Sequence, residues 1–314
     1  MARNKITIIG AGNVGASCAL WLAPMNLGDI VLKDIPAAGT MPAGKALDLL
    51  QCGPVMGFDA RITGTTEYGP TEGSDVIVFT GGFPRKPGMS REDLVAKNEE
   101  VVVDVMNEVK RTSPNAVVIM VTNPLDTMAY VAYKTSGFAR NHIMGQAGIL
   151  DSARFRTFIA EELNVSVNSV QAFTIGGHGD EMVPLVRSAT VGGVPLTKAL
   201  SKARLDAIVE RTRKGGGEVV QLLGTSAYYA PGAASAQMVE AILNDRKLIV
   251  PVAAYLDGEY GLKDMYFGVM AKQGRNGVEE IIEVDLDAEE RAALDKSVEL
   301  IRGTMGALVQ VKPA

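Results

Sequence analysis

Residues 5–22, read as Lys-Ile-Thr-Ile-Ile-Gly-Ala-Gly-Asn-Val-Gly-Ala-Ser-Cys-Ala-Leu-Trp-Leu, decide the fold of this chain. β-Branched residues predict a short strand, glycines follow at 10, 12 and 15, and an apolar run predicts a helix. In this spacing the first glycine allows a tight turn, the second admits a pyrophosphate, and the third lets the helix pack closely on the strand. The helix N-terminus offers N–H groups and a positive dipole end to the phosphates. The turn therefore predicts a dinucleotide site made by Gly10, Ala11, Gly12, Asn13, Val14 and Gly15.

A second predicted strand, residues 29–34, supplies the context that a glycine motif needs. It ends in Asp34, about 20 residues after the glycines, where a carboxylate accepts the ribose hydroxyls of a dinucleotide. The loop over residues 35–41 holds no lysine or arginine to receive a 2′-phosphate, so the sequence predicts NAD rather than NADP. The alternative, that residues 1–25 form a signal peptide or a membrane helix, is disfavoured because glycines and a proline interrupt the apolar run.

The composition is typical of a globular protein with a large core. The 314 residues are 47% hydrophobic and 21% charged, which fits two lobes or one large α/β domain. The net charge is −5 and no basic block is present, so nucleic acid and membranes are not expected as partners. Cys18 and Cys52 are too few for a disulfide scaffold or a four-thiolate zinc site. We therefore expect a reduced, cytoplasmic location and no metal.

The order of predicted elements indicates an α/β fold. Strands and helices alternate as far as residue 136, with further strands at 74–80 and 116–122 and helices at 42–51, 91–112 and 125–136. This alternation is typical of a doubly wound parallel sheet, the Rossmann fold. Later elements mix helices with antiparallel pieces: helices at 149–163, 202–223, 233–244 and from 288, and strands at 169–175, 182–194 and 248–284. We expect a Rossmann NAD-binding domain over residues 1–145 and a C-terminal α+β substrate-binding domain over residues 146–314.

Candidate chemistry lies in two loops that follow predicted strands. Residues 81–91 follow a buried strand at its carboxyl end, where open α/β sheets bind their ligands. His178 is one of two histidines and is flanked by glycines, which bring the backbone close to a ligand and leave the imidazole accessible. A lone histidine is more often structural than catalytic, but Asp151 on the preceding helix offers it a partner.

Five motifs in order resemble the lactate/malate dehydrogenase family, and most closely its malate dehydrogenases of the lactate-dehydrogenase-like bacterial type. The resemblance covers nearly the whole chain and no motif position departs from the family pattern. The motifs are the glycine turn, Gly82-Phe-Pro-Arg-Lys-Pro-Gly-Met-Ser-Arg91, Val121-Thr-Asn-Pro-Leu125, Gly148-Ile-Leu-Asp-Ser-Ala-Arg154 and Ile175-Gly-Gly-His-Gly-Asp-Glu-Met-Val-Pro184.

The resemblance implies a role for each site residue. His178 is implied as the proton acceptor, Asp151 as the carboxylate that stabilises its imidazolium, and Arg91 as the group that polarises the carbonyl oxygen. Substrate contacts are implied for Arg85, Arg91, Asn123 and Arg154, and cofactor contacts, besides the glycine turn and Asp34, for Asn98, Val121, Thr122 and Asn123. A cis peptide is implied between Asn123 and Pro124.

The implied reaction is reversible hydride transfer between NAD and C2 of (S)-malate, in a homodimer or a homotetramer. The alternative within enzymes is a lactate or other 2-hydroxyacid dehydrogenase, and Arg85 distinguishes the two because malate carries a second carboxylate. The alternative outside enzymes is an NAD-binding regulator that has lost the reaction. Intact His178, Asp151, Arg91 and Arg154 argue against it, because cofactor binding alone requires none of them.

Overall fold

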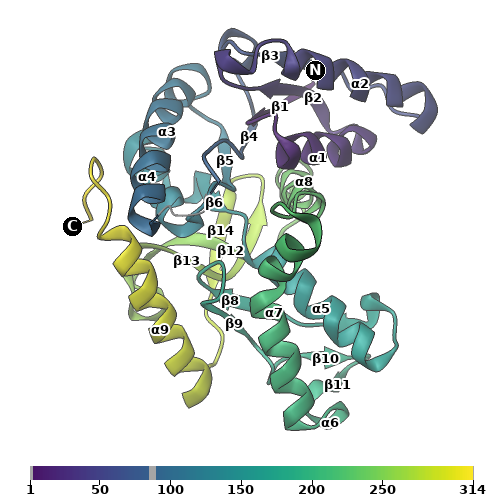
Figure 1. The fold of residues 1–314 in the computed structure, drawn as a ribbon, viewed down its shortest axis with the longest axis vertical. Helices are drawn as coiled ribbons and strands as arrows, with labels where there is room; N and C mark the ends of the chain where they lie inside the picture. The colour runs from purple at the N-terminus through teal and green to yellow at the C-terminus, as the bar shows by residue number, and fades with distance from the viewer. Residues whose placement is uncertain (1–2, 85–89, 314) are drawn as a thin grey trace.

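The computed structural model describes residues 3–84 and 90–313. Within these residues the main sheet has nine strands in the order β14-β13-β12-β6-β5-β4-β1-β2-β3 (Figure 1). Its strands are β1 (Asn4–Ile9), β2 (Gly28–Lys33), β3 (Ile62–Thr65), β4 (Val76–Phe79), β5 (Val117–Met120), β6 (Ile143–Gly145), β12 (Leu248–Asp257), β13 (Lys263–Gly274) and β14 (Gly277–Ile282). The six strands from β3 to β6 are parallel, in the Rossmann order 3-2-1-4-5-6. The predicted fold class is confirmed.

The glycine turn between β1 and helix α1 (Asn13–Leu22) has the geometry that the spacing predicts. Gly10 has a φ of +99°, which side chains other than glycine rarely adopt. A Cβ on Gly15 would lie 1.9 Å from the carbonyl oxygen of Gly10, so only glycine fits there. A Cβ on Gly12 would meet nothing within 4 Å, so the space beside this residue is open. No side chain caps the helix that follows, which leaves the N-terminus of α1 open to a ligand.

The helices that follow keep most of their expected bounds. They are α2 (Met41–Met56), α3 (Arg91–Thr112), α4 (Leu125–Ser136), α5 (Gly148–Leu163), α6 (Leu196–Ala199), α7 (Lys202–Leu223), α8 (Tyr229–Leu243) and α9 (Ala288–Met305). Ser90 caps α3, and its side chain accepts the N–H of Asp93. Helix α8 begins four residues earlier than expected, because Pro231 is tolerated in a first turn where no N–H is needed. Within residues 3–84 and 90–313 no helix is long and apolar enough to cross a membrane.

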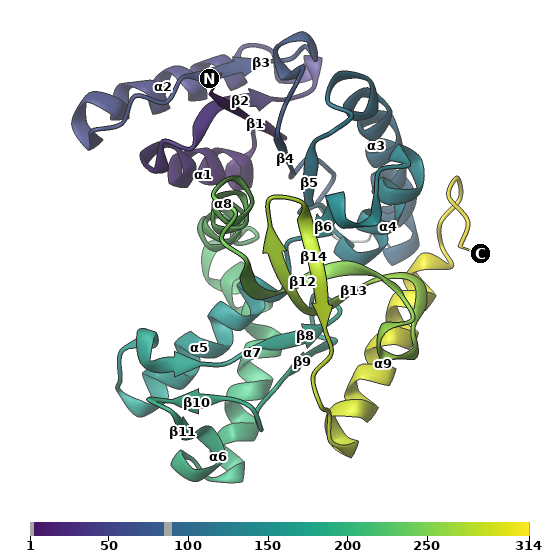
Figure 2. The ribbon, with the colours of Figure 1, turned by 180° about the vertical axis from the view of Figure 1, so that it is seen from behind.

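The C-terminal half adds to the same sheet. Strand β12 runs antiparallel to β6 through the pair Ala253–Gly145, and β13 and β14 continue outward (Figure 2). The single strand expected at 169–175 is two short strands, because the chain changes partners partway. Strand β7 (Val170–Gln171) pairs with β10 (Thr190–Val191), which forms a hairpin with β11 (Val194–Pro195). Strand β8 (Thr174–Gly176) pairs with β9 (Met182–Pro184).

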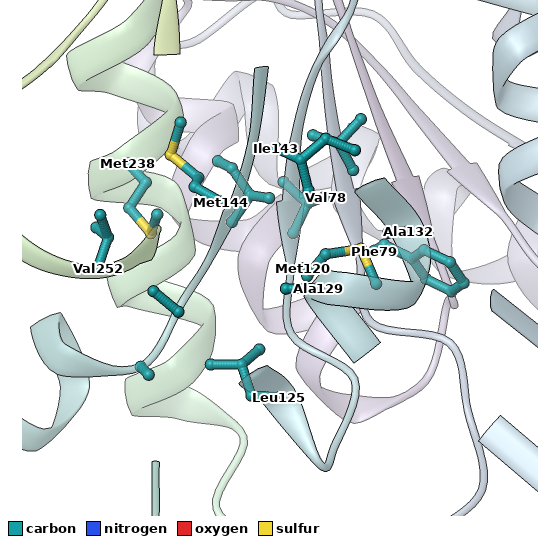
Figure 3. Close-up of a cluster of buried hydrophobic side chains, with 14 of the residues drawn as sticks. Val78, Phe79, Met120, Leu125, Ala129, Ala132, Ile143, Met144, Met238 and Val252 are labelled. Atoms are coloured by element: carbon teal, nitrogen blue, oxygen red, sulfur yellow. The ribbon is translucent and has the colours of Figure 1, made fainter. Parts of the chain in front are cut away.

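The main core lies where the parallel strands meet the antiparallel ones. Val78, Met120 and Ile143 come from adjacent parallel strands, and Met238 of α8 and Val252 of β12 lie in the same cluster (Figure 3). All five are buried. Cys18 also belongs to this core, and neither cysteine is in a disulfide. Burial of this apolar surface supplies the main driving force for joining the two halves of the chain.

Candidate active site

The imidazole of His178 and two charged groups of α5 lie together near the carboxyl ends of the parallel strands. Helix α5 follows β6 almost directly and places Asp151 and Arg154 one turn apart on one face. His178 lies in the turn after β8, and its Nδ1 is 2.9 Å from Oδ2 of Asp151. Arg154 donates from Nη1 to Oδ1 of the same carboxylate at 3.1 Å. Asp151 is only 2% exposed, so it is not a solvated charge at a helix end.

The charges around His178 determine its protonation. Burial alone lowers the pKa of an imidazole, but the charge of Asp151 and its hydrogen bond outweigh burial here, so the pKa of His178 lies above its ordinary value. Arg154 works in the opposite direction and Asp126 in the same direction as Asp151. Because Nδ1–H is the donor that fits a carboxylate acceptor, the neutral ring carries its lone pair on Nε2.

A cleft of about 600 Å³ lies in front of this pair. Among the residues that the sequence singled out, those lining it are Val14, Val121, Thr122, Asn123, Arg154 and His178. The Asn123–Pro124 peptide at its edge is cis, as the resemblance implied. The cleft lies at the carboxyl ends of the parallel strands, where open α/β sheets bind ligands.

Asp34 and an unexpected lysine hold the glycine turn from two sides. Oδ2 of Asp34 accepts the N–H of Ala11 at 2.8 Å, and Oδ1 accepts the N–H of Ile35. Nζ of Lys45, on α2, donates to the carbonyl oxygen of Ala11 at 2.7 Å. The loop over residues 35–41 holds no cation, but the fold brings one to the turn from the next helix.

Asn98 holds the backbone at the edge of the cleft. Its Oδ1 accepts the N–H of Phe83, and its Nδ2 donates to the carbonyl oxygens of Phe83 and Asn123. Thr122 donates to the carbonyl oxygen of Gly81 at 2.5 Å. Both side chains therefore fix the start of the loop that follows β4.

The predicted roles of Arg85 and the side chain of Arg91 fall outside what the structure describes. Arg85 lies in the interval 85–89, and only the backbone of Arg91, at the first position of α3, is described. These two roles stay predictions.

Several residues of the cleft were not found from the sequence. Gln146 directly follows β6 and is 3% exposed. Its Nε2 has no hydrogen-bond partner among the described residues. Its position after a strand's carboxyl end was a usable signal. Others come from α7 and the turn before α8, whose approach to the cleft no local pattern indicates: Arg213, Gly216, Gly217, Val220, Ser226 and Ala227.

A Rossmann sheet with an open glycine turn and an imidazole–carboxylate pair in its cleft defines a dinucleotide-dependent dehydrogenase. Comparison with models of protein families identifies the family within this class. Residues 4–145 match the lactate/malate dehydrogenase NAD binding domain, and residues 149–310 match the lactate/malate dehydrogenase alpha/beta C-terminal domain. The chain belongs to the lactate/malate dehydrogenase family.

Individual relatives are similar over almost their whole length. The malate dehydrogenases of Roseiflexus sp. (strain RS-1) and Rhodopirellula baltica are each 57% identical, over 98% of this chain and 99% and 98% of those proteins. The solved malate dehydrogenase from Salinibacter ruber is 54% identical with a TM-score of 0.92, covering 96% of this chain and 97% of that one. A lactate dehydrogenase from Cryptosporidium parvum, solved with lactic acid and NAD, has a TM-score of 0.95 at 41% identity, covering 99% of each chain.

Proposed function

We propose that this chain catalyses the reversible oxidation of (S)-malate to oxaloacetate with NAD. The observation that carries the proposal is the His178–Asp151 pair at the cleft, with Arg154 beside it. High identity to proteins named malate dehydrogenase supports the substrate. The backbone fold does not choose between malate and lactate, since dehydrogenases of both kinds superpose on it with similar TM-scores.

The residues at the carboxyl edge of the parallel strands fit a dinucleotide. The N-terminus of α1 is uncapped and Gly12 faces open space, which suits a pyrophosphate. Asp34 keeps lone pairs for ribose hydroxyls beside the bonds that it already accepts. The buried Nε2 of Gln146 and the side chain of Asn123 line the cleft where a nicotinamide would lie. When bound, NAD supplies the two-electron chemistry of the oxidation.

His178 moves the proton of this reaction. With Nδ1–H donated to Asp151, Nε2 accepts the substrate hydroxyl proton during oxidation and returns it during reduction. The Asp151 carboxylate then faces an imidazolium, which it stabilises. Its burial strengthens this interaction, because the two charges are poorly screened by water.

Arginine side chains bind the substrate carboxylates. Arg154 keeps guanidinium N–H groups beyond the one bonded to Asp151, and they are available to the C1 carboxylate. We assign Arg91 to the carbonyl oxygen of the substrate, and Asn123 to a contact with the same region of the substrate. We assign Arg85 to the distal carboxylate. A neutral residue in place of Arg85 would leave that carboxylate unpaired in a closed site, which is costly.

Steady-state rates of NADH oxidation with oxaloacetate and with pyruvate test the function. We expect oxaloacetate to be preferred, and Arg85→Gln to move the ratio of kcat/KM toward pyruvate by about 10²–10⁴-fold. A wild-type preference for pyruvate would favour the lactate alternative. NADH binding without turnover of either substrate would favour the regulator alternative. An unchanged ratio in Arg85→Gln would remove Arg85 as the discriminating residue.

We also propose a division of labour between residues 1–145 and residues 146–314. Asp34 and the glycine turn lie before the boundary, whereas Asp151, Arg154 and His178 lie after it. The family models change at the same place. Strands β12 to β14 nevertheless extend the N-terminal sheet, so the two parts share one core.

A homodimer or homotetramer is part of the proposal. Exposed large apolar side chains gather on α1 and α2, and α1 packs against α8. They are Leu20 and Trp21 on α1, and Met41, Leu47, Leu50, Val55 and Met56 on α2. Light scattering of the purified chain measures the mass, and a monomer would contradict the assignment. A cytoplasmic location is supported by the two unpaired cysteines, one of them buried.

A further inference from the structure

Asp126 is a buried carboxylate beneath the backbone of His178. It lies in the first turn of α4 and is 5% exposed. Its Oδ2 accepts the backbone N–H of His178 at 3.1 Å. Its Oδ1 is buried and has no hydrogen-bond partner among the described residues. The next residue toward the N-terminus, Leu125, packs in the main core, so this end of α4 is held firmly (Figure 3).

The surroundings make this charge expensive. Asp126 and His178 both line a small cavity of about 180 Å³, whose other walls include Leu94, Leu300 and Ile301. Burial raises the pKa of the Asp126 carboxyl to about 6. The dipole of α4 favours a negative charge in its first turn, but a neutral asparagine or serine could accept the same N–H with less desolvation. The hydrogen bond alone therefore does not explain a carboxylate at this position.

The charged groups around His178 show what the carboxylate does. In the described part of the chain they come from α4, α5, α7 and the loop of His178 itself: Asp126, Asp151, Arg154, Asp180, Glu181 and Arg213. Two of them raise the pKa of His178, namely Asp151 through its ring contact and Asp126 through its charge, whereas Arg154 lowers it. Asp126 contacts the backbone N–H of His178, whereas Asp151 contacts its imidazole ring. The two carboxylates therefore contact different parts of the same residue.

Resting on the proposed function, we propose that Asp126 is a second positioning residue for proton transfer by His178. By accepting the His178 N–H it fixes the turn of residues 177–179, so that Nδ1 meets Asp151. By its charge it favours the imidazolium that forms when His178 takes the substrate proton. Asp151 and Asp126 thus act on one imidazole from two helices, α5 and α4.

Direct titration of the imidazole tests this inference without relying on turnover. The chain has two histidines, so NMR of isotope-labelled histidine in the full chain with NAD gives two titrations, which His142→Asn assigns. Asp126→Asn keeps a hydrogen-bond acceptor and removes the charge. We expect the midpoint of His178 to move to lower pH and that of His142 to stay. Asp104→Asn, an exposed carboxylate of α3, is the matched control and should move neither.

Kinetics give a second readout that a purely structural role would not move. In Asp126→Asn the fall of oxaloacetate kcat/KM with rising pH should occur at lower pH, and the rise for malate oxidation should move with it. A merely structural residue would lower both rates with unchanged midpoints. If Asp126→Asn does not fold, Asp126→Ser offers a smaller neutral acceptor. An unchanged His178 midpoint in the folded variant overturns the inference. Absence of oxaloacetate turnover in the wild type would instead overturn the proposed function, and the NMR titration would still decide the role of Asp126.

Discussion

Ala11 is held from both sides, by the carboxylate of Asp34 at its N–H and by the ammonium of Lys45 at its carbonyl oxygen. The carboxylate repels a 2′-phosphate, whereas the ammonium would attract it. Asp34 therefore works against a cation that the fold already places at the glycine turn, and its removal should have a larger effect than the sequence alone indicates.

We predict that Asp34→Ser raises kcat/KM for NADPH relative to NADH by about 10- to 100-fold, the value of one charge-assisted hydrogen bond. The double variant Asp34→Ser/Lys45→Met should lose most of that gain. Lys198→Met, on α6 and far along the chain, is the control for removal of a lysine. Equal ratios in the single and double variants would show that Lys45 does not contact the phosphate.

The protonation of His178 sets a pH dependence with a definite sign. Malate oxidation needs the neutral ring and oxaloacetate reduction needs the imidazolium. Because Asp151 and its hydrogen bond outweigh burial and raise the pKa of His178, reduction should persist above pH 6.5, the ordinary imidazole value, and then fall, while oxidation rises.

Rate–pH profiles in both directions measure this crossover. Asp151→Asn should move both midpoints to lower pH and reduce turnover, because the imidazolium loses its nearest anion. His178→Asn should retain NADH binding and lose about 10²–10⁴-fold in kcat. Near-full activity in His178→Asn would refute the assignment of the proton acceptor.

At the scale of elements, helix α7 packs against α5 through glycine. A Cβ on Gly215 would lie 3.1 Å from Cδ of Arg154, tighter than most real contacts, and 3.7 Å from Phe158. The helix accepts the low helix propensity of glycine here, which costs about 1 kcal/mol relative to alanine. Because Gly215 has no side chain, Arg154 has room to remain hydrogen-bonded to Asp151.

Gly215→Ala should therefore raise KM for oxaloacetate by about tenfold, roughly the 1–2 kcal/mol that a displaced charge-assisted contact costs, with KM for NADH unchanged. Gly303→Ala on α9 is the matched control, because a Cβ there meets nothing within 4 Å. It should raise the thermal midpoint through helix propensity and leave both KM values alone. An unchanged KM for oxaloacetate in Gly215→Ala would show that the clearance is not needed.

At the scale of the whole molecule, residues 309–311 near the C-terminus are hydrogen-bonded to helix α3, which belongs to residues 1–145. Helix α9 lies against α3 and α4, and the chain beyond it continues alongside them (Figure 1). The buried carboxylate of Glu99, on α3, accepts the N–H groups of Val309, Gln310 and Val311 at 2.7–2.8 Å. Leu308 is buried just before them. The neighbouring residue of α3, Asn98, holds the edge of the cleft, so this helix links the chain end to the site.

We predict that Glu99→Gln lowers the free energy of unfolding by about 1–3 kcal/mol, because an amide NH₂ would face a backbone donor in a buried position. Hydrogen exchange at residues 309–311 should accelerate more than exchange in the parallel strands. Glu100→Gln, the exposed next residue, should change neither quantity. Unchanged exchange at the chain end in Glu99→Gln would mean that the tail is held by other contacts.

The sequence by itself determined the local features of this protein. The glycine turn, the alternation of strands and helices, the Ser90 cap and the αL residue Gly137 that ends α4 are all encoded by neighbours in the chain. Each depends on backbone conformations or hydrogen bonds a few residues apart, and such interactions leave a pattern that can be read. The roles of the cleft residues came instead from the resemblance to the lactate/malate dehydrogenase family, since no local pattern assigns them.

Only the tertiary structure decided which distant groups meet. Nothing local places β12 beside β6, Lys45 at Ala11, or Asp126 beneath His178, which is 52 residues away in the chain. These contacts result from packing the sheet and helices around one core, where burial selects the partners and no spacing rule records them. For the same reason the composition of residues 248–284 predicted strands but not the sheet that they join.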